Sequence, residues 1–515
     1  MSHPPGLLLR FKTLLGLRPV SDRTRRFTED AREFRDRVAA QRERLRGASG
    51  GKRTAFLITP WMRTAVPFFS VETAFLAAAL GLQPIFIWDA ANVVHNAGSA
   101  HETEAVRSIV DALRGVAEVR EPGEEDPEAQ PPEALLFENF VRASRGERLA
   151  HAKLAAEPET AAVFQRHYRR IFRLLAETRP DHLVLPGGLW GLSGLYLHAA
   201  QQLGIPVTTY DSGTGLLALD HSGITAHYGD IATAWRKYRP IVLAEAALRE
   251  RVWQSARESL DRRMHGRDHF QLQTQTPDAA TAPPCDVLIP LNFRMDSAAM
   301  LRNRIFSNVE EWLTGILDWL EARPGVTAVI RQHPCERMER YRGSDDWSEL
   351  VAARPALADR VRYVGASEPF NTYSLLEKCR MVVPYTSRLG AEAGLLGVPS
   401  VVATTCYYSD SDFVFRAADR ADFERLLDAA VEGRLQLDDD QRCSAALVYS
   451  LIENCTLLRT PFTPAIENFR KWVKVPHAEF EQLEGVADFI SALFDRTPVP
   501  GMLFERTFRP ASIDA

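Results

Sequence analysis

Two series of alternating strand-like and helical segments, separated by a polar stretch, constrain the fold of this chain more than any other feature. Before residue 266, apolar runs such as RTAFLITP, QPIFIWDA, DHLVLPGG and IPVTTYDSG alternate with helical sequence. After residue 285 the alternation restarts with DVLIPLN, VTAVIRQHP and VRYVG. Strands in such an alternation pair in parallel, because a parallel connection needs a helix-length crossover. The sequence therefore predicts an α/β fold with two parallel sheets.

The chain has 515 residues, which is more than one hydrophobic core usually holds. We expect two Rossmann-like lobes that face each other across a cleft, with ligands beyond the carboxyl ends of their strands. The stretch between the two series is polar, rich in Pro, Ala and Thr, and lacks periodicity, which is typical of a linker. The predicted parts are an N-terminal basic helical arm (1–48), the first lobe (49–265), the linker (266–285), the second lobe (286–475), and a C-terminal helix and tail (476–515) that could fold back onto the first lobe.

The composition excludes several classes of protein. A net charge of −5 and a pI near 6.3 give no reason to expect a nucleic-acid partner. The six cysteines include no CxxC pair, which argues against a zinc ribbon and favours a reducing, cytoplasmic setting. The sequence contains no run of about 18 uncharged apolar residues, so no membrane-spanning helix is predicted. The N-terminal GLLLRFKTLLGL is interrupted by charges, unlike a secretory signal; it could form a basic helix at a membrane surface, although packing on its own domain is the favoured interpretation.

The stretch VVPYTSRLGAEAGLLGVPSVVAT predicts a single β-α-β unit. Residues 381–384 form an apolar run typical of a buried strand. Ser387 is a good helix N-cap, and Gly397 followed by Val398-Pro399 ends the helix before the next strand at 401–402. Hydroxyls and unpaired N–H groups at a helix N-terminus attract anions. We therefore expect an anion site at this strand end.

A second strand, VTAVIRQHP, ends in residues suited to the same anion. A guanidinium can hold two phosphate oxygens in parallel, and an imidazole can donate to a third. Pro334 biases His333 towards an extended conformation. The alternative is an ordinary exit from a strand into a loop. Two adjacent strand ends that both offer phosphate donors favour a site, whose candidate residues are Arg331, His333, Pro334, Tyr385, Thr386 and Ser387.

Three further residues have a functional and a structural interpretation. Glu392 could accept hydrogen bonds from ribose hydroxyls, or pair with Arg388 one helical turn away. Gly390 could let a ligand approach the backbone, or simply allow helix packing. Asp211 ends a strand of the first lobe before a Gly-rich loop, so it could be a general base or form an ordinary turn.

Other motifs are weaker. LPGGLWGLSG lacks the spacing of a P-loop or a dinucleotide fingerprint and could face a sugar or an acceptor. The histidines and aspartates near residues 220–230 fit no standard metal spacing, so no metal site is predicted.

The runs VIRQHP, NTYSLLEKC and VVPYTSRLGAEAGLLGVPSVV resemble, in that order, the capsule polysaccharide biosynthesis family, which includes Kdo transferases of GT-B architecture. The resemblance covers roughly residues 286–405. It implies that the second lobe holds a nucleotide-sugar and that the first takes the acceptor. His333 and Pro334 would match the family's HP pair, and Thr386 and Ser387 its hydroxyl pair. Glu392 would bind the ribose, and Arg331 would assist at the phosphate.

The resemblance implies a metal-independent glycosyltransferase of surface (capsular or lipo-) polysaccharide biosynthesis, with the nucleotide-sugar as substrate and no cofactor. A CMP-sugar is the favoured donor, and a saccharide or lipid-linked molecule the acceptor. Peripheral contact with the inner membrane is the alternative already considered for the basic arm. Asp211 would be the base, and His333 would act on the leaving phosphate. Alternatives of the same fold are a nucleotide-sugar epimerase, a transferase of polyol phosphate from a CDP-linked donor, and a non-catalytic assembly protein.

Overall fold

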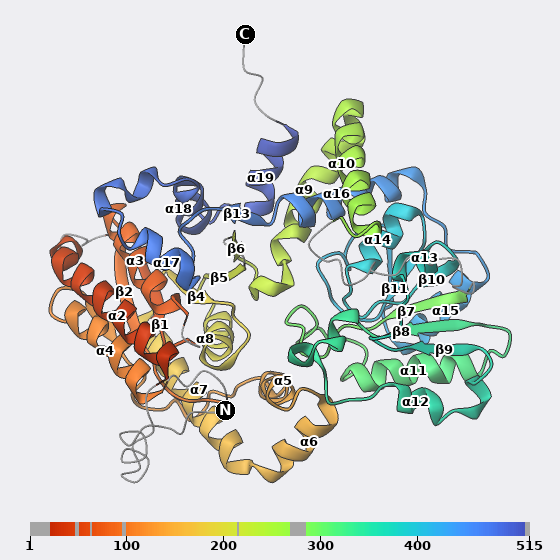
Figure 1. The fold of residues 1–515 in the computed structure, drawn as a ribbon, viewed down its shortest axis with the longest axis horizontal. Coiled ribbons are helices and arrows are strands. Elements are labelled where there is room, and N and C mark those ends of the chain that lie inside the picture. The colour runs from red at the N-terminus through yellow and green to blue at the C-terminus, as the bar shows by residue number, and fades with distance from the viewer. Residues whose placement is uncertain are drawn as a thin grey trace, which may run out of the picture.

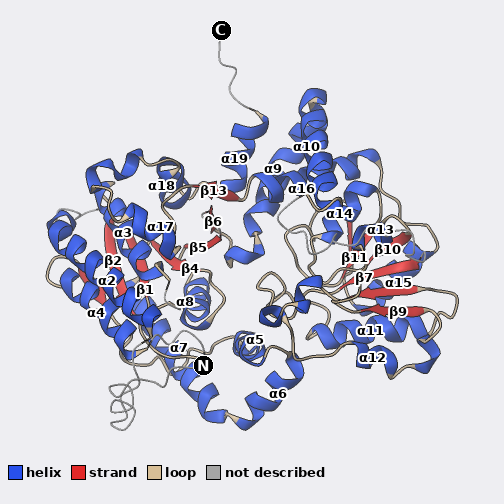
Figure 2. Cartoon of the chain, viewed as in Figure 1, coloured by secondary structure: helices blue, strands red, loops and turns tan. Residues whose placement is uncertain are grey.

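The computed structural model describes residues 21–46, 51–61, 64–94, 99–213, 216–267 and 285–509. It contains two lobes side by side, each built on its own sheet (Figure 1). Helices cover both faces of each sheet (Figure 2). The predicted α/β, GT-B-like fold of two Rossmann-like lobes is confirmed.

Among the described residues, the first sheet has seven strands in the order β13-β6-β5-β4-β1-β2-β3. Its parallel part runs β3-β2-β1-β4-β5, and β6 and β13 add antiparallel at one edge. This order reverses between β1 and β4, which makes that point the switch point of a doubly wound sheet. The bounds are β1 (Arg53–Ile58), β2 (Gln83–Trp88), β3 (Glu118–Arg120), β4 (His182–Pro186), β5 (Val207–Gly213), β6 (Leu216–Asp220) and β13 (Leu457–Arg459).

The second sheet has six described strands, all parallel, in the order β12-β11-β10-β7-β8-β9. Counted along the chain this is again the order of a dinucleotide-binding sheet, and its switch point lies between β7 and β10. The bounds are β7 (Cys285–Pro290), β8 (Ala328–Arg331), β9 (Val361–Val364), β10 (Cys379–Val382), β11 (Ser400–Val402) and β12 (Val414–Arg416).

Alternation along the strands divides the core of the first lobe between two faces. In β1, Phe56 and Ile58 point to one face, while Ala55 and Leu57 point to the other. The first face is covered by α2 (Asp22–Gln41), α3 (Val66–Ala79), α4 (Ala100–Leu113), α17 (Ile466–Trp472) and α18 (Val486–Phe494). The other is covered by α5 (Glu133–Ser144), α6 (Glu147–Ala156), α7 (Pro158–Thr178) and α8 (Gly191–Gln202).

The second lobe is also covered on both faces, partly by helices that precede the linker. One face packs against α11 (Val309–Glu321), α12 (Ser348–Ala352) and α15 (Arg420–Val431). The other packs against α9 (Gly229–Ala244), α10 (Ala246–Met264), α13 (Thr372–Leu376), α14 (Leu389–Leu396), α16 (Asp439–Asn454) and α19 (Val499–Phe508). Helices α9 and α10 therefore belong to the core of the second lobe, although the sequence analysis placed them in the first.

Short 3₁₀ helices occupy several connections between these elements. They are η1 (Arg42–Leu45), η2 (Thr225–His227), η5 (Pro334–Arg337), η6 (Glu339–Tyr341), η7 (Pro355–Leu357) and η8 (His477–Gln482).

The chain returns to the first lobe near its C-terminus. Strand β13 pairs with β6, and Phe462, Phe469 and Trp472 lie in the first-lobe core. Figure 1 shows α17 and α18, in blue, over the red and orange helices. The expected return of the tail is thus present, but it begins at β13, before residue 475, where the sequence analysis ended the second lobe.

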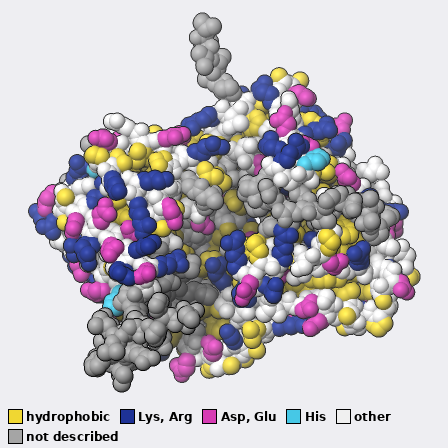
Figure 3. Space-filling view, in the orientation of Figure 1, with side chains coloured by type: hydrophobic (Ala, Val, Ile, Leu, Met, Phe, Trp, Pro, Cys, Tyr) yellow, Lys and Arg dark blue, Asp and Glu magenta, His cyan; other side chains and the backbone are white. Residues whose placement is uncertain are grey.

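The described part of the N-terminal arm packs within the first lobe, because Phe27 and Phe34 of α2 lie against Phe68. The basic stretch before residue 21, for which membrane contact was the alternative considered, lies outside the described residues, as does most of the linker. None of the described helices is long and apolar enough to cross a membrane. Basic and acidic side chains are interspersed over the face shown in Figure 3.

A buried ionic cluster joins the lobes on the side of α5 and α6. Arg294, which follows β7, contacts Glu138 of α5 at 3.2 Å and Glu147 of α6 at 2.7 Å. Glu147 also accepts the N–H groups of Val309 and Glu310 in the first turn of α11, both at 3.1 Å. The three charged side chains are at most 4% exposed. We call Arg294, Glu138 and Glu147 the interlobe cluster.

Candidate functional site

A cavity of about 390 Å³ opens at the carboxyl ends of β7, β8 and β10, at the switch point of the second sheet. This is where ligands of doubly wound sheets bind. Most residues selected from the sequence line it, although they come from separate strands and loops. They are Arg331, His333, Pro334, Thr386, Ser387 and Glu392.

His333 is held in one tautomer by its own turn. Its backbone is extended, as Pro334 predicts, and its Nδ1 accepts a hydrogen bond from the N–H of Cys335 at 3.2 Å. Burial, aided by the charge of Arg331, lowers the pKa of His333 to about 4. The imidazole is therefore neutral at pH 7, with the proton on Nε2. Because Nε2 makes no hydrogen bond within the described residues, it can donate to a ligand in the cavity.

Arg331 is buried, and much of its guanidinium is occupied. Nη1 and Nη2 donate to the backbone carbonyls of Val364, which ends the neighbouring strand β9, and of Gly365 and Phe370, which follow it. Its Nε has no hydrogen-bond partner in the described structure. Burial lowers the pKa of Arg331 to about 10, so it stays charged at neutral pH. Arg331 thus places a positive charge behind His333 and fixes the loop after β9, rather than presenting a free two-pronged donor.

Thr386 and Ser387 lead into α14. The predicted N-cap is displaced by one residue: Arg388 is the N-cap of α14, and Ser387, just before it, accepts the N–H of Leu389 at its Oγ at 3.3 Å. Gly397 ends the helix with φ of 83°, and its N–H donates to the carbonyls of Ala393 and Gly394. The Thr386 hydroxyl is buried and has no partner among the described residues. The N–H groups at the start of α14 are occupied, because those of Leu389 and Gly390 donate to Ser387 and those of Ala391 and Glu392 donate to the Arg388 carbonyl. The unpaired helix N–H groups expected from the sequence are therefore not found among these residues, and the Thr386 hydroxyl is the donor that remains for an anion.

Glu392 lies in a buried charge network instead of facing the cavity with free oxygens. Its Oε1 lies 3.4 Å from Arg263, and its Oε2 accepts the Tyr373 hydroxyl at 3.2 Å. Glu453 pairs in turn with both Arg263 and Arg388. Burial raises the pKa of Glu392, while the two arginines act against that rise. The network directs two guanidinium groups to the cavity wall, which adds positive charge beside the anion donors.

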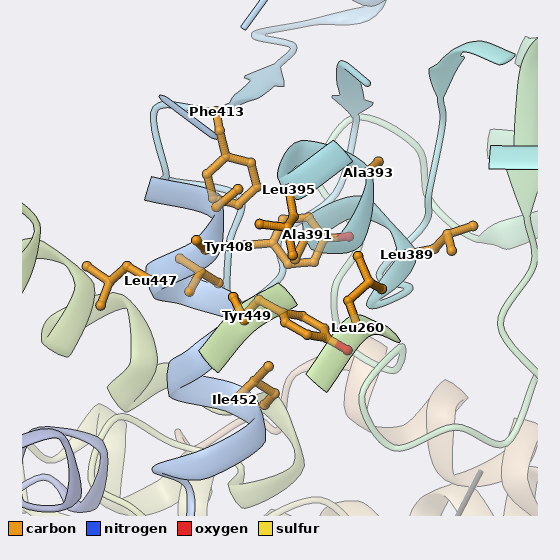
Figure 4. Close-up of a cluster of buried hydrophobic side chains, with 14 of the residues drawn as sticks. Leu260, Leu389, Ala391, Ala393, Leu395, Tyr408, Phe413, Leu447, Tyr449 and Ile452 are labelled. Carbon is orange, nitrogen blue, oxygen red and sulfur yellow. The ribbon is translucent and has the colours of Figure 1, made fainter. Parts of the chain in front are cut away.

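Two of the residues selected for the second-lobe site do not line its cavity. Tyr385 is buried on the opposite face of the sheet, where its ring contacts Trp312 at 5.3 Å and its hydroxyl bonds to Asn303. Gly390 faces Tyr408: a Cβ at this position would lie 2.4 Å from the tyrosine hydroxyl. Figure 4 shows Tyr408 against α14. Gly390 is thus explained by helix packing, which was the alternative considered from the sequence.

The sequence analysis missed the loop after β7, which supplies the cavity's central wall. Asn292 accepts the N–H of Thr386 at 3.2 Å and donates to Asp296 at 3.0 Å, so it connects the two switch-point strands. Phe293 contacts the ring of His333 at 5.4 Å. The signal was present: β7 is the first strand of its lobe, and in the common doubly wound strand orders the first strand borders the switch point.

A second cavity, of about 430 Å³, lies at the carboxyl ends of β4 and β5 in the first lobe. Asp211 lines it, together with Gly187 and Trp190 of the LPGGLWG loop. Gly187 and Gly188 have φ of 62° and 82°, so this loop needs glycine for its backbone conformation. One Asp211 oxygen accepts the N–H of Ser212 at 2.7 Å, and the side chain remains exposed to water in the cleft.

The two cavities are neighbours. Ser297 lines the first-lobe cavity, while Asp296 and Ala298, on either side of it, line the second-lobe cavity. Tyr228 in the second-lobe cavity also lies within range of charges from both lobes. Burial raises its pKa, Arg388 opposes that rise, and Asp211 contributes to it. The two cavities therefore adjoin at residues 296–298, and Asp211 lies within electrostatic range of Tyr228 in the second-lobe cavity.

No group of three or more His, Cys, Asp or Glu side chains in the described part of the chain is arranged to hold a metal ion.

Comparison with known proteins finds similarity only among solved structures. No protein-family model matches the chain, and no curated protein matches it. The chain is similar to the β-Kdo 2,4-transferase KpsC of Thermosulfurimonas dismutans, at 14% identity and a TM-score of 0.33, over 57% of this chain and 87% of that one.

Two UDP-GlcNAc 2-epimerases are also similar. The Neisseria meningitidis protein, bound to UDP-GlcNAc, is 11% identical with a TM-score of 0.23, over 78% of this chain and 100% of that one. A putative one from Listeria monocytogenes is 9% identical with a TM-score of 0.25, over 88% and 99%. Because these scores are low, we argue function from the cavities themselves.

Proposed function

We propose that this protein is a metal-independent glycosyltransferase of surface polysaccharide biosynthesis, which transfers a sugar from a nucleotide donor to a saccharide or lipid-linked acceptor. The observation that carries the proposal is the pairing of the two cavities. One offers a neutral imidazole donor and the hydroxyls of Thr386 and Ser387 to an anion, and the other, which adjoins it, holds the Asp211 carboxylate.

The second-lobe cavity would bind the nucleotide diphosphate or monophosphate. His333 Nε2 and the Thr386 and Ser387 hydroxyls would donate to phosphate oxygens, and Arg263 and Arg388 would add positive charge. Fixed donors aimed at the leaving phosphate stabilise the charge that develops as the glycosidic bond breaks. Because Glu392 is already paired with Arg263 and Tyr373, we assign it to orienting Arg263.

Asp211 would act as the general base. Its free carboxylate oxygen would take the proton from an acceptor hydroxyl while the oxygen of that hydroxyl attacks the anomeric carbon of the donor sugar. The walls of the cavity remove part of the water around the Asp211 carboxylate and so raise its pKa, while the Ser212 N–H and the charge of Arg142 oppose that rise. A carboxylate of raised pKa is a stronger base than a fully solvated one, so the setting suits proton abstraction.

The first test is a thermal-shift panel of CMP, CDP, UDP, GDP and ADP, with the CMP-sugar donor as the leading expectation. A nucleotide at about 100 times its dissociation constant stabilises the folded protein by roughly 2.7 kcal/mol. We expect a shift that is selective for one base, is lost in His333→Ala, and is kept in the control His101→Ala, which changes an exposed histidine of α4.

Product analysis then separates transfer from its rivals. Sugar transfer to an acceptor supports the proposal. An isomerised nucleotide-sugar would indicate an epimerase, a transferred polyol phosphate would indicate a CDP-polyol enzyme, and binding without turnover would favour an assembly protein. No shift with any nucleotide would refute the phosphate site at His333 and Thr386.

A further inference from the structure

Arg142 in the first-lobe cavity is a guanidinium without an acceptor. Its Cζ lies 4.1 Å from the centroid of the Trp190 ring, so it stacks on the indole face. The side chain is half-buried, lines the cavity, and makes no hydrogen bond or ion pair with any described residue. Burial lowers its pKa, and the charge of Asp211 acts in the opposite direction. Five N–H donors therefore remain available at this wall of the cavity.

A half-buried arginine with a purely structural role looks different in this protein. Arg360 is buried to a similar degree and donates to three backbone carbonyls, at 2.7, 3.0 and 3.1 Å. Donors that lose water without gaining a partner are costly, so structural arginines are normally satisfied in this way. Arg142 instead keeps its donors facing a cavity that can admit a ligand.

We propose that the first-lobe cavity takes an acceptor saccharide that carries an anionic group, and that Arg142 binds this group. The inference rests on the proposed function and adds the chemical class of the acceptor. A carboxylate or a phosphate on the sugar presents two oxygens in the spacing that a guanidinium matches with parallel bonds. Trp190 holds the guanidinium plane in place, and the half-buried Trp61 offers an apolar surface in the same cavity.

The other charges around the cavity are consistent with this assignment. Arg23 and Glu467 are both exposed at its lining, opposite in sign, and screened by water. Asp211 is the remaining carboxylate, and it would face the acceptor hydroxyl that reacts. An anionic group held by Arg142 therefore orients the acceptor, with its charge at the arginine and a neighbouring hydroxyl towards Asp211.

The experiment is a ligand-observed NMR titration of the full chain with D-glucose, D-glucuronic acid and D-glucose 6-phosphate. A charge-assisted hydrogen bond should make at least one charged sugar bind about 10-fold tighter than glucose. The charged sugar with the larger increase in affinity over glucose, glucuronic acid or glucose 6-phosphate, shows whether the cavity prefers a carboxylate or a phosphate. In Arg142→Gln the preference should fall to within about threefold, and Arg142→Lys should restore part of it because the charge returns.

Two readouts keep this proposal separate from the proposed function. The nucleotide thermal shift should be unchanged in Arg142→Gln, which also shows that the variant is folded, and His333→Ala should keep the preference for the charged sugar. The proposal is overturned if wild type binds glucose as well as both charged sugars, if neither charged sugar binds at millimolar concentration, or if Arg142→Gln keeps the preference. A missing nucleotide shift in wild type refutes the donor site alone.

Discussion

Replacing Arg294 by Met should loosen the contact between the lobes. The change removes the only cation of the interlobe cluster and leaves the Glu138 and Glu147 carboxylates buried at 2% and 0% exposure. Removing one partner of a buried ion pair typically costs about 3–5 kcal/mol, because the remaining charge is uncompensated. Glu147 keeps its two backbone donors on α11, which places the expected cost at the lower end of that range.

Hydrogen exchange measures this cost at the atoms concerned. The N–H groups of Leu301, Val309 and Glu310 donate to the two carboxylates, so their protection depends on the docking of α5 and α6. A loss of about 3 kcal/mol in local opening free energy accelerates their exchange by roughly 100-fold when exchange follows the opening equilibrium. Amides in the centre of each sheet should be little affected.

The control is Arg148→Ala, on the same interface. Arg148 pairs with Glu310 and Glu349 but is 40% exposed, so its loss should cost about 1 kcal/mol or less. If exchange in Arg294→Met is no faster than in this control, the cluster does not hold the lobes together and the reasoning fails.

The loss of stability caused by Arg294→Met should also depend on pH. Burial already raises the pKa of Glu138, and loss of Arg294 raises it further. A carboxyl whose folded pKa lies above its unfolded value loses stability as pH rises through that interval. The difference between Arg294→Met and wild type should therefore be larger at pH 8 than at pH 5.5.

Three further predictions concern the cavities and their support. Because His333 has a pKa of about 4, it is neutral from pH 6 to 8, so the ratio of nucleotide affinities between wild type and His333→Gln should stay constant to about twofold over that range; a ratio that climbs as pH falls through 6.5 would show a protonated imidazole. Gly390→Ala should lower the unfolding free energy by about 1–3 kcal/mol by crowding Tyr408, whereas Gly325→Ala, where a Cβ meets nothing within 4 Å, should change it by less than about 0.5 kcal/mol in a denaturant titration. Asp211→Asn should reduce transfer by about 100- to 10,000-fold with the nucleotide shift intact, and activity within tenfold of wild type would remove Asp211 as the base.

Much of the candidate site was predictable because its elements are local. His333 and Pro334 at one strand end, and Thr386 and Ser387 at another, are set by short-range rules for strands and helix caps. Parallel strands then bring those ends to the same edge of a sheet. The wall after β7 could have been predicted in the same way, from the position of that strand in its lobe.

The sequence by itself determined two α/β lobes, each built around parallel strands, and the strand ends that carry anion donors. Hydrophobic periodicity and capping depend on neighbours a few residues away, so these features can be predicted locally. Tertiary structure alone decided which side chains face the cavity. It turned Tyr385 into the core, paired Glu392 with Arg263 across 129 positions, and left Arg142 without an acceptor among the described residues. Those outcomes depend on which distant segments meet, and no local pattern of residues encodes such a meeting.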